Sequence, residues 1–176
     1  MTQPTPAPAP APAPPAAEAI VADLVARAQA AMAAYENRDQ ARVDEAVSAL
    51  AWSIYKPAHA RMLAEMAVAD TGLGTADSKV IKNTRKTFGT LRDLMRARSV
   101  GVIDEQSEKG LVLYGKPVGV VGAVCPSTNP AATPVNKAMM ALKGGNAVIV
   151  APSPAGYATT AKAVELMRAE LQKAGH

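Results

Sequence analysis

The chain has 176 residues, of which 49% are apolar and 3% aromatic, and its formal net charge is +4. This length suits one ordinary domain with a core of aliphatic side chains. Its basic residues are scattered among acidic ones rather than gathered on a face with stacking aromatics, so we expect no nucleic acid partner.

The cysteine and histidine content argues against a metal site. Cys125 is the only cysteine, which excludes a disulfide framework and a cysteine-based metal cluster within the chain. His59 and His176 lack the spacing of metal ligands.

No apolar run approaches the roughly 18 residues that span a bilayer, and the N-terminus lacks the features of a signal peptide. We therefore expect a cytoplasmic protein with no metal and no membrane partner.

Residues 1–17 differ in composition from the rest of the chain. They hold seven of the fourteen prolines and no charged side chain. Proline fixes φ and removes backbone donors, so this segment is predicted to be an extended, disordered Pro/Ala-rich tail. It could tether the protein to a partner or a shell, or be a plain solvated tail, and composition leaves both readings open.

Residues 18–98 are predicted to be helical because apolar residues recur at helical spacing. The first helix would run from about 18 to 36, and the second from an Asp39 N-cap to Pro57. A third, around residues 62–67, would end at the glycines of residues 71–74. A fourth would be capped by Asp77 or Ser78. Its apolar side chains would be Val80, Ile81, Phe88, Leu91 and Leu94.

After about residue 99 the pattern changes to strands alternating with helices. Residues 111–114 would form a short strand, 117–124 a strand buried on both faces, 130–142 a helix, 146–150 a second buried strand and 156–174 a second helix. This order predicts a parallel sheet. The strand ends, Cys125-Pro126-Ser127 and Ala151-Pro152-Ser153, would meet at the sheet edge where open α/β sheets bind ligands.

The run from Lys116 to Pro130 is followed by Lys143-Gly144-Gly145-Asn146 and a strand to Val150. These residues resemble the aldehyde dehydrogenase superfamily. The resemblance covers about residues 60–175 and is specific from 110 to 154. Two departures from the common family pattern are typical of its coenzyme A-acylating branch, namely Ser127-Thr128-Asn129-Pro130 at the first strand end and Ala151-Pro152-Ser153-Pro154 at the second. Upstream, Asp70-Thr71-Gly72 and the segment 79–83 are similar to the same branch.

This resemblance implies an α/β fold in which residues 18–98 are N-terminal helices and residues 99–176 form the first, incomplete βαβα part of an NAD(P)-binding domain. The activity implied is oxidation of a small aldehyde with NAD or NADP and transfer of the acyl group to coenzyme A, by a complete protein that is a homo-oligomer. Sulfoacetaldehyde, acetaldehyde and propionaldehyde are candidate substrates. A non-catalytic nucleotide-binding or interaction module is the alternative.

Asn129 matches the oxyanion-hole asparagine of the family, whose side-chain N–H donates to the developing oxyanion. An asparagine that ends a strand or caps a helix is the structural alternative. Cys125 is a less plausible nucleophile, because an apolar strand end favours a neutral thiol. The resemblance places the nucleophilic cysteine downstream of this sequence.

Cofactor contacts are expected from two segments. The first comprises Val124, Cys125, Pro126, Ser127 and Thr128, and the second comprises Ala151, Pro152, Ser153 and Pro154. The family carboxylate that binds the adenosine ribose is replaced by Pro154 and the usual lysine by Ala151, so the sequence does not choose between NAD and NADP. Ser153 could donate to the ribose or phosphate, or be a turn residue. Lys137 and Lys143 are expected to be solvated, and Trp52 to lie in the core or at an interface.

Overall fold

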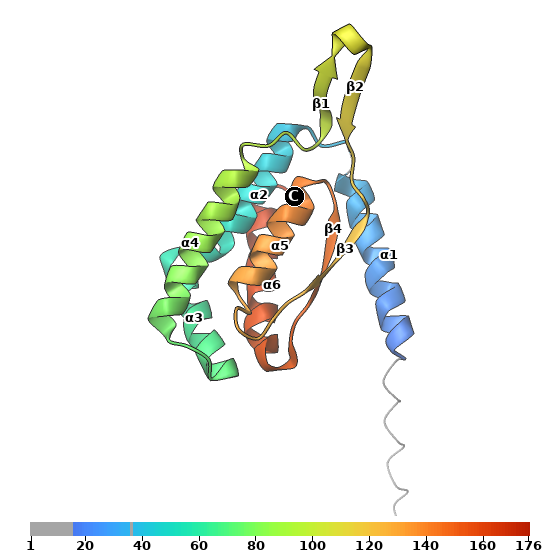
Figure 1. The fold of residues 1–176 in the computed structure, drawn as a ribbon. Helices are drawn as coiled ribbons and strands as arrows, with labels where there is room; N and C mark the ends of the chain where they lie inside the picture. The colour runs from blue at the N-terminus through green and yellow to red at the C-terminus, as the bar shows by residue number, and fades with distance from the viewer. Residues whose placement is uncertain (1–15, 36) are drawn as a thin grey trace, which may run out of the picture.

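The structure is a computed structural model that describes residues 16–35 and 37–176. The predicted tail lies outside these residues except at its end, where helix α1 already begins at Ala17. Four helices are followed by a β-hairpin and then by a βαβα unit (Figure 1). The predicted α/β class is therefore confirmed, and the predicted elements occur in the expected order with one strand in addition.

The helices of the first half begin and end close to the predicted positions. They are α1 (Ala17–Tyr35), α2 (Gln40–Tyr55), α3 (Pro57–Thr71) and α4 (Ala76–Leu94). The Asp39 carboxylate accepts from the Arg42 amide at 2.8 Å, so the predicted N-cap of α2 is confirmed. α3 ends at Gly72, whose φ of 65° is the left-handed conformation that glycine adopts without steric cost. The cap of α4 is Thr75 rather than Asp77 or Ser78, because the Thr75 hydroxyl accepts from the Ser78 amide.

α4 buries a polar stripe instead of an apolar face. Lys79, Asn83 and Thr87, which are spaced by four residues, are its buried side chains. Two of the predicted apolar positions, Ile81 and Phe88, are each 53% exposed. Hydrogen bonds to other parts of the chain offset the free-energy cost of burying Lys79 and Asn83. Helical periodicity alone does not reveal these bonds.

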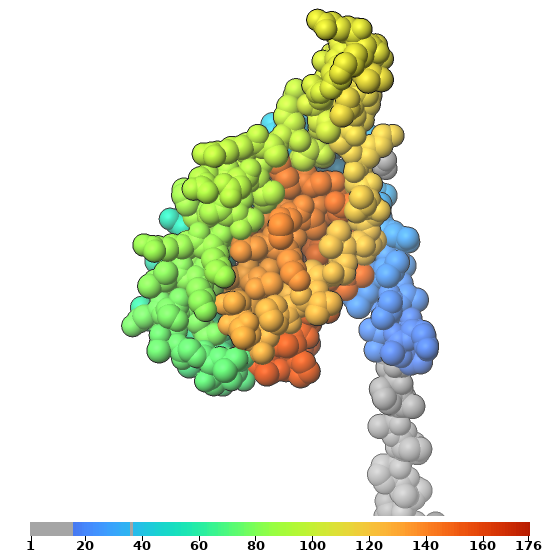
Figure 2. Space-filling view, viewed as in Figure 1, coloured from blue at the N-terminus to red at the C-terminus, as the bar shows by residue number. Residues whose placement is uncertain are grey.

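A hairpin projects from the body of the molecule (Figures 1 and 2). It pairs β1 (Gly101–Gln106) with β2 (Leu111–Gly115) in antiparallel register. The sequence predicted β2 only. β1 was missed because most of it is exposed, and its Asp-Glu-Gln end lacks the apolar alternation of a half-buried strand.

The βαβα unit follows with β3 (Val120–Val124), α5 (Ala132–Lys143), β4 (Ala147–Ala151) and α6 (Tyr157–Lys173). β3 and β4 pair in parallel, as predicted, with Val120 opposite Ala147 and Val124 opposite Ala151. The Asn146 side-chain oxygen accepts from the Val118 and Gly119 amides at 2.7 and 3.0 Å, which ties the turn before β4 to the start of β3.

The core lies among helices rather than on the sheet. Its buried cluster joins α2, α3, α5 and α6 through residues such as Leu50, Ile54, Leu63, Val135 and Met139. The prediction that both parallel strands are buried on both faces is wrong, since most of their residues are half-buried and Val124 is 72% exposed. The two-stranded sheet lies between α1 and α5, and neither of its edges is paired with a further strand among the described residues.

Two single residues also differ from expectation. Trp52 is 48% exposed, so it does not lie in the core of the described chain; it contacts Tyr55, and the Lys56 ammonium lies over its ring. Lys143 is buried rather than solvated, because it forms an ion pair with Asp44 of α2. The charge of Lys143 could be placed in the interior only because α2 brings a carboxylate to it.

Candidate functional site

The ends of β3 and β4 lie side by side. The Cys125 amide donates to the Ala151 carbonyl at 2.8 Å, which continues the parallel ladder one residue beyond β3. The segments 124–128 and 151–154 are therefore adjacent at one edge of the sheet, where the sequence placed a ligand.

Just beyond the two segments, Gly156 lies close against Pro130. A Cβ on Gly156 would lie 2.7 Å from the Pro130 Cβ, so any side chain at this position would push the segments apart. The Thr160 hydroxyl of α6, which is buried, donates to the Pro130 carbonyl at 2.8 Å. The edge is thus a packed corner with a fixed shape.

The predicted cofactor contacts differ in accessibility. Val124, Pro126, Thr128, Ala151 and Pro154 are exposed, so a ligand could contact all five. Ser127, Pro152 and Ser153 are half-buried. Ser153 also caps the turn after β4, because its hydroxyl accepts from the Gly156 amide at 3.2 Å.

The Cys125 side chain is unsuited to nucleophilic attack. It is only 3% exposed and donates to the Ala123 carbonyl at 3.3 Å. Burial raises the pKa of the thiol, although the nearby Lys137 opposes the rise. A neutral, enclosed thiol is a packing residue, as the sequence suggested.

Asn129 lies between the strand end and α5 with its side chain half-buried. Its main-chain carbonyl accepts from the Thr133 amide at 3.3 Å, but α5 has Ala131 at its N-cap and no side-chain cap. The capping role considered for Asn129 is therefore not observed. Within the described residues its side-chain amide forms no hydrogen bond and is not among the fully buried polar groups without a partner, so its N–H donors are available to a ligand.

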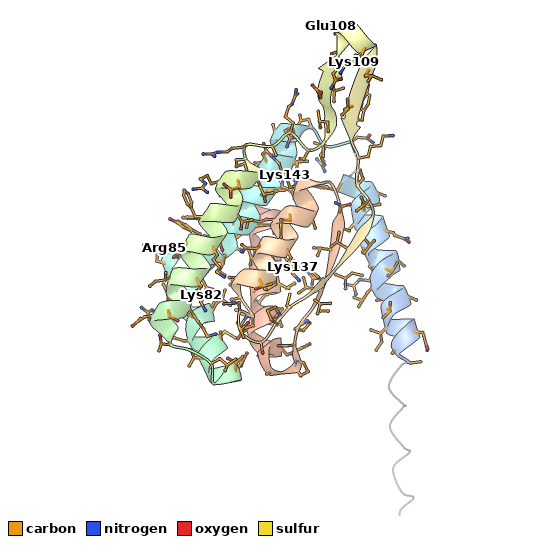
Figure 3. All side chains as sticks on the ribbon, viewed as in Figure 1. Lys82, Arg85, Glu108, Lys109, Lys137 and Lys143 are labelled. Atoms are coloured by element: carbon orange, nitrogen blue, oxygen red, sulfur yellow. The ribbon has the colours of Figure 1, made fainter. Side chains whose placement is uncertain are left out.

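Lysines from two helices hold the main chain of this corner. The Lys137 ammonium of α5 donates to the Val124 carbonyl, so Lys137 is not simply solvated. The buried Lys79 of α4 donates to the Thr128 carbonyl at 3.1 Å. Figure 3 shows Lys137 on α5, with Lys82 and Arg85 along the neighbouring α4. The sequence linked residues 79–83 to the acylating branch without assigning Lys79 a role.

A further contact joins α3 to the start of α6. The Asp70 carboxylate accepts from the Thr159 amide at 2.8 Å and from its hydroxyl at 2.6 Å. The carboxylate thus satisfies an N-terminal amide of α6, which has no local side-chain cap. Asp70 also belongs to the segment whose resemblance to the acylating branch was noted.

An open groove of about 370 Å³ lies beside β4 and α6. Its walls include Val150, Pro152, Tyr157, Val164 and Arg168. Except for Pro152, these residues were not predicted, because they become neighbours only when α6 packs back along β4. A larger hollow lies along α1 but has none of the strand-end residues in its walls.

Nowhere between residues 16 and 176, leaving residue 36 aside, do three or more His, Cys, Asp or Glu side chains gather where they could hold a metal ion. None of the helices in the described ranges has the length and apolar character needed to cross a membrane.

The parallel strands belong to a partial Rossmann-like α/β unit, and the sequence matches the aldehyde dehydrogenase family over residues 2–174. The chain belongs to this family. The relatives include acylating enzymes. Sulfoacetaldehyde dehydrogenase (acylating) of Cupriavidus necator is 55% identical over 160 residues, which are 91% of this chain and 32% of that protein.

Solved structures of acylating relatives have the same fold. An acetylating aldehyde dehydrogenase from Geobacillus thermoglucosidasius has a TM-score of 0.85 and 31% identity, over 89% of this chain and 34% of that one. A propionaldehyde dehydrogenase from Rhodopseudomonas palustris with bound CoA has a TM-score of 0.73 and 25% identity, over 88% of this chain and 34% of that one. The chain spans about a third of the length of these relatives and matches their N-terminal part.

Proposed function

We propose that this chain is the N-terminal part of a coenzyme A-acylating aldehyde dehydrogenase. The complete protein would convert an aldehyde, CoA and NAD(P)+ into acyl-CoA, NAD(P)H and a proton. The observation that carries the proposal is the half-buried Asn129, whose side-chain donors are unused in the described chain, at the corner between two adjacent strand ends.

Asn129 would act by stabilising negative charge. When a cysteine thiolate attacks the aldehyde carbon, the carbonyl oxygen gains charge, and an amide N–H directed at that oxygen lowers the barrier. Cys125 cannot supply the thiolate because it is enclosed and its pKa is raised. We expect the nucleophile in a part of the complete protein that is not included in these 176 residues.

The residues of the two strand ends would bind the nicotinamide cofactor, which supplies the hydride acceptor that aldehyde oxidation requires. Five exposed residues line this edge, and the groove beside Pro152 and Tyr157 offers a largely apolar wall for a flat ring. Ser153 already accepts a hydrogen bond from Gly156, yet its hydroxyl proton remains available to a ribose or phosphate oxygen. We propose that the half-buried Ser127 and Pro152 also contact the cofactor, whereas the Cys125 side chain, at 3% exposure, is too enclosed to do so.

Pro154 and Ala151 do not select between NAD and NADP. With Pro154 exposed at the strand end, no carboxylate at this position would repel a 2′-phosphate. With Ala151 in place of lysine, no cation at that position would attract the 2′-phosphate either. We therefore propose a nicotinamide cofactor that is either NAD or NADP.

Sulfoacetaldehyde is the first candidate substrate, because the relative that is 55% identical is named for it. Acetaldehyde and propionaldehyde are the next candidates. We also propose a cytoplasmic homo-oligomer. Support for assembly comes from the projecting hairpin, which exposes Val112, Leu113 and Tyr114.

The test is an assay of the complete polypeptide with each of the three aldehydes, with and without CoA, following NAD(P)H formation. We expect turnover that requires CoA and is fastest with sulfoacetaldehyde. Asn129→Ala should lower kcat by about 10²- to 10³-fold, the usual cost of one lost oxyanion donor. Oxidation to a free acid without CoA would reject the acylating activity, and binding of NAD(P) without any turnover would favour a non-catalytic nucleotide-binding module.

A further inference from the structure

The buried polar stripe of α4 reaches two different elements. The Asn83 side-chain amide donates to the Ala60 carbonyl at 3.0 Å, which joins α4 to α3. One helical turn earlier, the Lys79 ammonium donates to the Thr128 carbonyl at 3.1 Å. The first contact is internal to the helical half, whereas the second joins that half to the corner that carries Asn129.

A hydrogen bond to the Thr128 carbonyl acts directly on the backbone of Asn129. The peptide group between Thr128 and Asn129 is planar, so a bond that orients this carbonyl also orients the N–Cα bond of Asn129. On the other side of Asn129, its own carbonyl accepts from the Thr133 amide and the Pro130 carbonyl accepts from the Thr160 hydroxyl. Those two contacts come from inside the α/β unit, and Lys79 supplies one from outside it.

Lys79 is held in place by burial. Its side chain is 5% exposed, and a Cβ on Gly74 would lie 3.9 Å from its Cε. Burial lowers the pKa of the ammonium, and the charge of Lys82 lowers it further. Within the described residues no carboxylate lies within ion-pair distance of Lys79, so the Thr128 carbonyl compensates the buried charge. A charged donor makes a stronger hydrogen bond than a neutral one.

We propose that Lys79 is a positioning residue for Asn129. It fixes the Thr128–Asn129 peptide group so that the Asn129 amide is held toward the substrate oxygen. The inference rests on the proposed oxyanion role of Asn129 and adds a residue from the helical half to the machinery. A misplacement of about 1 Å in an active site can cost about 10²-fold in rate, so loss of the Lys79 contact should change kcat by a measurable amount.

The test is a double-mutant cycle on kcat in the complete polypeptide. Lys79→Met keeps most of the side-chain volume and removes the donor, and we expect it to lower kcat by about 10-fold with less change in KM. In the Asn129→Ala background the same change should lower kcat by less than about 2-fold, because nothing remains to be positioned. Lys86→Met is the matched control, since Lys86 is an exposed lysine on the same helix.

The outcomes distinguish the positioning role of Lys79 from the oxyanion role of Asn129 on which it rests. Equal fold losses in both backgrounds, or an unchanged kcat in Lys79→Met, would overturn the positioning role while leaving the proposed function intact. An unaffected kcat in Asn129→Ala would instead overturn the oxyanion role itself. If Lys79→Met does not fold, Lys79→Gln retains a neutral donor on a shorter stem, and its loss must show the same dependence on Asn129.

Discussion

Replacing Asp70 should loosen the start of α6, although the two lie 89 residues apart in the chain. Asp70→Ala removes the acceptor of the Thr159 amide and hydroxyl, and Thr159 is fully buried. Leaving buried donors unpaired costs about 1–3 kcal/mol. Removing a carboxylate from a helix N-terminus costs about 0.3–1 kcal/mol more. We expect a total of about 2–3 kcal/mol for local opening of the first turn of α6.

Hydrogen exchange of the complete polypeptide measures this opening directly. The first-turn amides of α6 should exchange about 30- to 150-fold faster in Asp70→Ala, since about 1.4 kcal/mol corresponds to a factor of ten. Asp70→Asn retains an acceptor oxygen and loses only the charge, so its effect should be smaller, about 1 kcal/mol or less.

The matched control is Asp77→Ala. The Asp77 carboxylate pairs with Arg61 at 2.8 Å, but its side chain is 83% exposed. Exposed ion pairs contribute about 0–1 kcal/mol, so exchange in α6 should not change measurably. If Asp70→Ala left the exchange of α6 unchanged as well, the inferred capping across the two halves would be refuted.

Three further predictions concern buried groups. Cys125→Ala should keep kcat within about 2-fold of the unaltered protein, and the native thiol should react slowly with alkylating agents because burial raises its pKa. Asp44→Ala should lower the free energy of unfolding by about 3 kcal/mol, because it leaves the Lys143 ammonium buried without its partner. Hydrogen bonds from Lys173 and Lys56 lower the pKa of Glu170 below its ordinary value of 4.5. The stabilisation from Glu170 is therefore present above about pH 4.5 and lost as the pH falls through the lowered pKa, so Glu170→Gln should weaken the loss of stability in acid.

Each of these three predictions would be contradicted by a specific result. A loss of turnover above about 100-fold in Cys125→Ala would restore that thiol as a nucleophile candidate. Unfolding of Asp44→Ala at the same urea concentration as the unaltered protein would show that Lys143 finds another partner. An unchanged acid limb in Glu170→Gln would assign the acid sensitivity to other carboxylates.

The local pattern of the sequence determined the element order. Helical spacing, the Asp39 cap and the glycines after α3 and α5 are local signals, so the ends of most helices were predicted within a few residues. The parallel pairing of β3 and β4 followed from the strand–helix–strand order, because parallel strands need a crossover. The same order brought segments 124–128 and 151–154 to one edge.

Only the tertiary structure decided which polar groups are buried. The buried Lys79 and Lys143 and the half-buried Asp70 each find a partner at least 49 residues away in the chain, at Thr128, Asp44 and Thr159 respectively. A polar group can enter the interior only where such a partner meets it, and chain spacing carries no information about that meeting.

The lack of information about tertiary partners also explains why the buried face of α4 was predicted wrongly. Periodicity indicates which residues share a face of a helix, but not which face the neighbouring elements cover. α4 therefore exposes Ile81 and Phe88 while its polar stripe is buried. The sequence by itself determined the candidate corner around Asn129. The packing of α3 and α4 decided what holds it, because the contacts from Asp70 and Lys79 exist only in the folded chain.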